Sequence, residues 1–169
     1  CHLPAETLDG FRMQVLANIE LLEEVVAVND NGGEGIGLYR SEYSYLNRMD
    51  MPTEGELTEI YVDMASLVFP RKLVIRTLDV GADKLMRTQN VPEGNPALGL
   101  RAIRYCLKHR EIFRTQLRAI LRAGVAGNVS VMFPMISGLQ ELVEVKKFYR
   151  EVQRELFAEG TPFREDMPL

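Results

Sequence analysis

Arginines follow two apolar segments of the chain at the point where each segment turns polar. Arg40 ends the run GIGLYR (35–40), and Arg76 lies near the end of KLVIRTLDV (72–80). A guanidinium group can donate two parallel hydrogen bonds to a phosphate or a carboxylate. If both runs are strands of one parallel sheet, their carboxyl ends lie at the edge where α/β folds bind ligands. The spacing therefore predicts that Arg40 and Arg76 hold a small anionic ligand.

Other polar side chains are expected at the same edge of the sheet. They follow the first and third apolar runs or come from the long loop before the next helix: Asn18, Asp79, Lys84, Asn95 and Arg101. The alternative is that the arginines form structural ion pairs, Arg40 with Glu42 and Arg76 with Asp79. Because two strands repeat the arrangement, ligand binding is the favoured interpretation.

The elements that must position these residues alternate between strands and helices. Near-continuous apolar runs predict strands at 13–19, 35–40, 72–80 and 129–136, and apolar residues at helical spacing predict a helix after each strand. Strands of this kind are buried on both faces, as in a parallel sheet. Four such units are too few to close an eight-stranded barrel, which takes about 250 residues. The sequence therefore predicts an α/β fold, either a small open sheet or the first half of a TIM-type β/α barrel.

Helix boundaries can be predicted at three places in the chain. Thr53 and Glu56 have the spacing of a capping box, and Ser137 and Gln140 repeat that spacing before the last helix. The long helical pattern that precedes the fourth strand is expected to break near residues 108–109.

Composition restricts the class of protein. The 169 residues suffice for one domain with a sizeable core, and the net charge of −4 gives no overall basic field for nucleic acid or an acidic membrane surface. No apolar run approaches the roughly 20 residues of a membrane span, and no signal peptide opens the chain. The only cysteines are Cys1 and Cys106, so a disulfide framework is not expected and the cytoplasm is favoured. The start lacks Met, which suggests a piece cut from a longer protein.

Five motifs occur in order along the chain: GIGLYRSE, VIRTLDVGADK, NPALGLRAIR, QLRAILRA and VMFPMI. Together they resemble the phosphoenolpyruvate-utilising barrel domain of enzyme I, the phosphoenolpyruvate–protein phosphotransferase family of the bacterial phosphotransferase system. The resemblance extends from about residue 7 to residue 160, and it identifies residues 1–169 as a partial barrel domain with strands 1–4 and helices 1–4. Pyruvate phosphate dikinase and phosphoenolpyruvate synthase share the barrel and are the alternative parents.

The resemblance implies transfer of a phosphoryl group from phosphoenolpyruvate to a histidine on a separate domain, and then to a small phosphocarrier protein. Arg40 and Arg76 match the family's arginines that hold the phosphate. Lys84 and Arg101 match residues that line the same pocket, while the weaker matches Asn18, Asp79 and Asn95 are expected to line or orient it. The sugar and nitrogen-related branches of the system are not distinguished.

The family's remaining catalytic groups lie on later strands. These are the Mg²⁺ ligands and the cysteine that protonates the enolate, so no metal ligand is expected within this chain, and the chain alone is expected to be inactive. Cys106 does not match that cysteine and is expected to be a buried structural thiol. A different class of function stays open, namely a half-barrel module that serves assembly or regulation without catalysis.

Self-association is expected, because a half barrel leaves its first and fourth strands as open edges. It would also uncover the inner face of the barrel. Six apolar residues are candidates for this face: Ile36, Leu38, Val74, Ile75, Val131 and Phe133. A large apolar patch seldom stays exposed on a monomer. A homodimer is therefore predicted, and two copies could rebuild an eight-stranded barrel.

Overall fold

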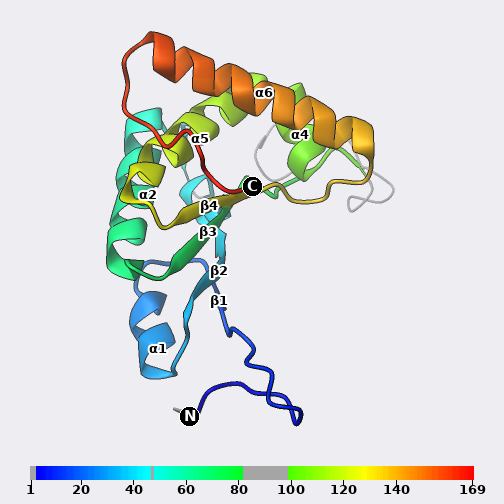
Figure 1. The fold of residues 1–169 in the computed structure, drawn as a ribbon. Coiled ribbons are helices and arrows are strands. Elements are labelled where there is room, and N and C mark those ends of the chain that lie inside the picture. Colours follow the sequence, from blue (N-terminus) through cyan, green and yellow to red (C-terminus); the bar gives the residue numbers. More distant parts are fainter. Residues whose placement is uncertain (1–2, 47, 82–98) are drawn as a thin grey trace.

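The computed structural model describes residues 3–46, 48–81 and 99–169, and its centre is a four-stranded parallel sheet (Figure 1). The strands follow chain order across the sheet: β1 (Ala17–Ile19), β2 (Gly35–Arg40), β3 (Lys72–Arg76) and β4 (Val129–Met132). The helices are α1 (Glu24–Asp30), α2 (Glu54–Val68), α4 (Ala102–Lys108), α5 (Arg110–Ala123) and α6 (Leu139–Ala158), with 3₁₀ turns η1 (Ser41–Ser44) and η2 (Gly124–Ala126). This alternation confirms the prediction of a partial β/α barrel.

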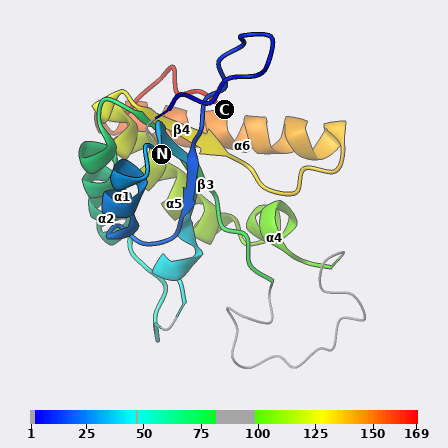
Figure 2. The same cartoon turned by 90° about the horizontal axis from the view of Figure 1, so that it is seen from below.

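Helices α1, α2 and α5 lie on one side of the sheet in Figure 1, and Figure 2 gives the view along a perpendicular direction. The core lies between that side of the sheet and the helices. Leu73 and Ile75 of β3 are fully buried there, as are Tyr61 of α2 and Phe113 of α5. Their burial follows from the period of two along a strand, which sends alternate side chains to one face.

The predicted inner face was assigned incorrectly. Ile36, Ile75 and Val131 are at most 2% exposed and belong to the core beneath the helices. The ring of Phe133 contacts the rings of Phe113 and Tyr149 on α5 and α6. Of the six residues assigned to that face, only Leu38 and Val74 are half-buried positions that alternate with the core residues of their strands.

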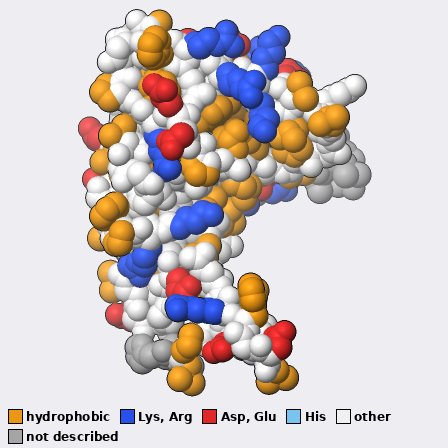
Figure 3. Space-filling model, viewed as in Figure 1, with side chains coloured by type: hydrophobic (Ala, Val, Ile, Leu, Met, Phe, Trp, Pro, Cys, Tyr) orange, Lys and Arg blue, Asp and Glu red, His pale blue; other side chains and the backbone are white. Residues whose placement is uncertain are grey.

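The other face of the sheet lies along a hollow in the molecular surface, seen at the right of Figure 3. Alternate strand positions place Val74, Arg76 and Met132 there, and their neighbours along the strands point into the core. Polar as well as apolar residues therefore line this face, because its carboxyl-terminal row consists of Arg40, Arg76 and Met132 in register.

Two strands end earlier than the apolar runs predict. Beyond β3, the backbone N–H groups of Leu78 and Asp79 donate to the side chains of Gln116 and Glu42, so they are diverted from the sheet. Beyond β4, Pro134 has no N–H to donate, and Met135 adopts a positive φ of 61°. Polar side chains and proline, rather than a loss of apolar residues, end these strands.

The predicted helix boundaries have mixed outcomes. The capping box of Thr53 and Glu56 is confirmed, as is the break between α4 and α5 at His109. The capping box of Ser137 and Gln140 is wrong, because Gly138 occupies the N-cap of α6. Instead, both the backbone N–H and the hydroxyl of Ser137 donate to the carboxylate of Glu141, which lies one position later than predicted.

The edge of β4 is partly used by the segment that follows α6. The backbone N–H of Val131 donates to the carbonyl of Pro168 at 3.0 Å, so this segment runs beside β4. The expectation that the fourth strand has a fully open edge is therefore wrong. In the part of the chain that the structure describes, no helix has both the length and the apolar character needed to cross a bilayer.

Candidate anion-binding site

Arg40 and Arg76 are neighbours at the carboxyl ends of β2 and β3. The two residues are partners in the register of the parallel pair, so their side chains leave the sheet side by side. Arg76 is in turn the register partner of Met132 on β4. The two arginines for which the sequence predicts binding of a small anion thus come together at one edge of the sheet.

Arg76 is held between two carboxylates. Its Nη2 lies 2.9 Å from Glu42 Oε1, and its Nη1 lies 3.2 Å from Asp79 Oδ2. The backbone N–H of Asp79 also donates to Glu42 Oε1, at 3.0 Å, which ties the segments after β2 and β3 together. Asp79 Oδ1 accepts a further hydrogen bond from Arg101 Nε at 2.9 Å. One acidic pair therefore positions two of the predicted cations, Arg76 and Arg101.

Arg40 has a different partner from the one that the ion-pair alternative assigns to it. Its Nη2 lies 2.9 Å from Oε2 of Glu20, the residue directly after β1, and Glu42 is engaged by Arg76 instead. The proposed pair of Arg40 and Glu42 is therefore wrong, whereas the pair of Arg76 and Asp79 is present. Spacing along the chain does not indicate Glu20, because register decides which residues of neighbouring strands become partners.

Several polar atoms of this cluster are buried without a hydrogen-bond partner among the described residues. They include Nε of Arg40 and Nε of Arg76, which are donors, and Oε2 of Glu42, which is an acceptor. Buried polar atoms in native proteins are nearly always paired, so unpaired ones need an explanation. Two guanidinium donors with unused hydrogen-bonding capacity fit an edge that accepts an anion from outside.

The other predicted site residues are placed differently. Asn18 is exposed on β1 and is in register with Leu38, two residues along β2 from Arg40. Lys84 and Asn95 lie outside the described residues.

The sequence analysis did not identify Gln116 as part of this region. Its side chain donates to Ser41, which follows Arg40, and accepts from Leu78, which lies between Arg76 and Asp79. A lone polar residue in the apolar stripe of a helix was the available signal.

The described residues do not form a magnesium site. Among residues 3–46, 48–81 and 99–169, no group of three or more His, Cys, Asp or Glu side chains is arranged to hold a metal ion. The two carboxylates nearest the arginines, Glu42 and Asp79, are already engaged by guanidinium and backbone donors. They therefore do not fit the open carboxylate set that Mg²⁺ needs.

Cys106 has no part in this chemistry. Its side chain is buried on α4, and burial raises the pKa of the thiol to about 12. At neutral pH the group is therefore a thiol rather than a nucleophilic thiolate, in agreement with its expected structural role.

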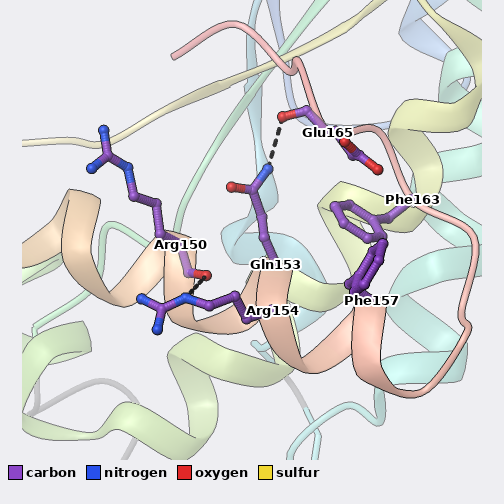
Figure 4. Close-up of a pocket in the computed structure, with 6 residues that line it drawn as sticks. All are labelled: Arg150, Gln153, Arg154, Phe157, Phe163 and Glu165. Atoms are coloured by element: carbon purple, nitrogen blue, oxygen red, sulfur yellow. Dashed lines mark hydrogen bonds between the residues drawn. The ribbon is translucent and has the colours of Figure 1, made fainter.

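A pocket at the end of α6 is separate from the strand-end arginines (Figure 4). Four of its residues come from α6 and two from the segment that follows: Arg150, Gln153, Arg154, Phe157, Phe163 and Glu165. None of them is a predicted site residue, and the amide of Gln153 donates to the carbonyl of Glu165.

The fold of the chain and its similarity to a known family together define the class of protein. A parallel sheet with one helix-covered face and polar residues at its carboxyl edge is typical of β/α-barrel-type proteins. The chain belongs to the family of PEP-utilising enzymes, PEP-binding domain, whose model matches residues 1–169.

Curated relatives agree with this assignment. The chain is 45% identical to a phosphoenolpyruvate-protein phosphotransferase of Priestia megaterium over 162 aligned residues. The aligned region covers 95% of this chain and 28% of that protein. Proteins of the same name from Staphylococcus aureus and Bacillus subtilis strain 168 are 43% and 42% identical, over 96% and 98% of this chain and 29% of each relative. The chain thus spans less than a third of the length of these relatives.

Proposed function

We propose that the chain is the phosphoenolpyruvate-binding part of a phosphoenolpyruvate–protein phosphotransferase. The observation that carries the proposal is the pairing of Arg40 and Arg76 in register at the carboxyl edge of the sheet, with an unsatisfied Nε on each. Family membership and the names of the relatives support the choice of anion. Phosphoenolpyruvate carries a phosphate and a carboxylate, and both match the fork of a guanidinium group.

In this proposal the two arginines have complementary roles. Arg76, fixed by Glu42 and Asp79, provides a positive charge whose position is set before the ligand arrives. Arg40, whose side chain is 42% exposed, turns from Glu20 to the phosphate when the ligand binds. Prearranged cations neutralise the charge on the phosphoryl oxygens in the transition state, which is the main protein contribution to phosphoryl transfer.

The whole reaction requires groups from elsewhere in the protein. The bond between phosphorus and the enol oxygen breaks, a bond from phosphorus to a histidine nitrogen forms, and the enolate takes a proton to give pyruvate. We propose that the histidine lies on another domain and passes the phosphoryl group to a phosphocarrier protein. Mg²⁺, held by ligands outside the described residues, would assist in the whole protein.

Further features of the whole protein follow from the same assignment. We propose a cytoplasmic homodimer that serves sugar transport or the nitrogen-related branch. The dimer is supported by the terminal position of β1 in the sheet and by the half-buried apolar residues Leu38 and Val74 on the face without helices. Sedimentation of the chain as a monomer at tens of micromolar would contradict self-association of this part.

Titration of the chain with phosphoenolpyruvate, followed by calorimetry, tests the proposal. Phosphoenolpyruvate is expected to bind. Pyruvate and lactate, which lack a phosphate group, are expected to bind more weakly. Added Mg²⁺ is not expected to tighten binding, because the described residues provide no carboxylate set for it. An unaltered, folded chain that does not bind phosphoenolpyruvate would contradict the proposal and favour an assembly module.

A further inference from the structure

A buried amide on α5 joins the two segments that carry the arginines. Gln116 is 0% exposed, and its Oε1 accepts a hydrogen bond from the backbone N–H of Leu78 at 2.9 Å. Its Nε2 donates to Ser41 Oγ at 2.9 Å and to the hydroxyl of Tyr61 at 3.2 Å. A backbone N–H can only donate, so the atom that faces Leu78 must be the amide oxygen, and the amide nitrogen must face the hydroxyls.

The hydroxyl of Ser41 extends this connection to the next strand. Its Oγ donates to the backbone carbonyl of Arg76 at 2.8 Å. Ser41 follows Arg40 directly, and Leu78 lies between Arg76 and Asp79. One amide and one hydroxyl therefore link the carboxyl ends of β2 and β3, each at a position next to or near an arginine of the candidate site.

We propose that Gln116 and Ser41 are positioning residues that set the separation of Arg40 and Arg76 for the anion. This inference rests on the proposed function, and it adds residues that do not themselves contact the ligand. Ion pairs at the surface can rearrange, but a fully buried amide with all of its partners in place is rigid. When a binding or catalytic group is displaced by about 1 Å, the rate of the reaction that it supports can fall by a factor of about 10².

The same hydrogen bonds also stabilise the fold, so the test needs a control that separates stability from positioning. Asn128 provides one, because its Nδ2 donates to the carbonyls of Ala65 and Arg71 at 2.9 and 3.0 Å. It joins the residue before β4 to α2 and to the residue before β3, at the opposite end of the strands from Arg76. Its loss should destabilise the chain without moving the arginines.

Three variants of the 169-residue chain test whether these residues position the arginines: Ser41→Ala, Gln116→Met and the control Asn128→Ala. For each one, Tm is measured, phosphoenolpyruvate is titrated at a temperature where the variant is folded, and amide hydrogen exchange is followed by NMR. Ser41→Ala removes a single oxygen atom, so it keeps the test decisive if Gln116→Met does not fold. All three are expected to lower Tm.

Ser41→Ala and Gln116→Met are expected to weaken phosphoenolpyruvate binding by roughly tenfold to a hundredfold. Gln116→Met is also expected to speed exchange of the amide of Leu78, because it removes the oxygen that accepts from this N–H. Asn128→Ala should change binding less than about twofold. Wild-type binding by Ser41→Ala, or a loss of binding by Asn128→Ala as large as that of Ser41→Ala, would overturn the positioning role. If the unaltered chain does not bind phosphoenolpyruvate, the proposed function fails, while unchanged exchange at Leu78 in Gln116→Met would overturn the link itself.

Discussion

Arg40 and Arg76 occupy partner positions in the register of β2 and β3, yet carboxylates from different parts of the chain hold their guanidinium groups. Arg76 is 18% exposed in its side chain and lies against Glu42, which is 9% exposed. Arg40 is 42% exposed and pairs with Glu20 near the surface. One arginine is therefore part of the buried structure, and the other can change partners.

Replacement of each arginine by alanine should separate binding from stability. Both Arg40→Ala and Arg76→Ala are expected to weaken phosphoenolpyruvate binding at least about tenfold, because each loses a charge-assisted contact to the anion. Arg76→Ala should also lower the free energy of unfolding by about 3 kcal/mol, since it leaves the buried carboxylate of Glu42 without a cation and Asp79 with Arg101 alone. Arg40→Ala should lower it by no more than about 1 kcal/mol, as for a surface ion pair.

Calorimetric titration and urea unfolding check these two effects. Arg12→Ala is the matched control, because Arg12 forms an exposed ion pair with Glu34 just before β2, at the opposite end of that strand. Its binding of phosphoenolpyruvate should equal that of the unaltered chain. Equal affinities for Arg40→Ala and Arg12→Ala would refute the phosphate-holding role of Arg40.

The partner of Arg40 allows a change in the opposite direction. Glu20→Gln removes the negative charge that competes with a bound phosphate for Arg40, so phosphoenolpyruvate affinity should rise about two- to fivefold, the range given by a surface ion pair of about 0.4–1 kcal/mol. Glu34→Gln, which neutralises a carboxylate of similar exposure at the other end of β2, should leave affinity unchanged. Weaker binding by Glu20→Gln would show that Glu20 supports the site instead of competing for it.

The edge of the sheet was predictable from sequence because it depends on a simple geometric rule. Parallel strands bring their carboxyl ends to the same side, so the strand pattern alone places Arg40 and Arg76 together. The pair of Arg76 and Asp79 was also predicted from spacing, but the other partners could not be placed in this way. Glu20 and Glu42 reach the arginines across strand boundaries, and that depends on register and on the course of η1, which spacing along the chain does not encode.

The faces of the strands were harder to predict than their positions. The apolar centre of a strand such as 73–75 contains no polar alternation, so by itself it does not show which residues face the helices. The structure sends Leu73 and Ile75 to the helices and leaves Val74 half-buried on the other face. Gln116 is the reverse case, because its polarity within the apolar stripe of α5 was visible in the sequence but its partners were not.

The glycine that opens β2 makes a prediction about close packing. Gly35 has a φ of +149°, and a Cβ at this position would lie 2.7 Å from the carbonyl oxygen of Lys72 on β3. Gly35→Ala should therefore lower the free energy of unfolding by about 1–3 kcal/mol, through backbone strain and displacement of the strand. Gly55→Ala in α2 is the control, since the nearest atom lies at 4.0 Å, and alanine should stabilise the helix slightly. Urea unfolding in which Gly35→Ala matched Gly55→Ala would contradict the close approach.

The capping box of α2 makes stability depend on pH. Glu56 accepts hydrogen bonds from the backbone N–H of Thr53 at 2.7 Å and from its hydroxyl at 2.9 Å, and it also pairs with Arg48. The backbone hydrogen bond from Thr53, followed by the contacts with Arg48 and the Thr53 hydroxyl, lowers the pKa of Glu56 from 4.5 to about 2. Because the pKa is lower in the folded state, ionised Glu56 stabilises the fold above pH 4.5, and this contribution is lost as the pH falls from 4.5 towards 2.

Glu56→Gln should therefore be less stable than the unaltered chain at pH 7, and the difference should shrink as the pH falls below 4.5. Urea unfolding of both proteins at intervals between about pH 7 and pH 3 measures this difference. Glu59→Gln, an exposed change one turn further along α2, is the control and should show no such trend. A difference between Glu56→Gln and the unaltered chain that stayed constant across this range would show that the ionised carboxylate does not stabilise the helix, and that the capping box acts through geometry alone.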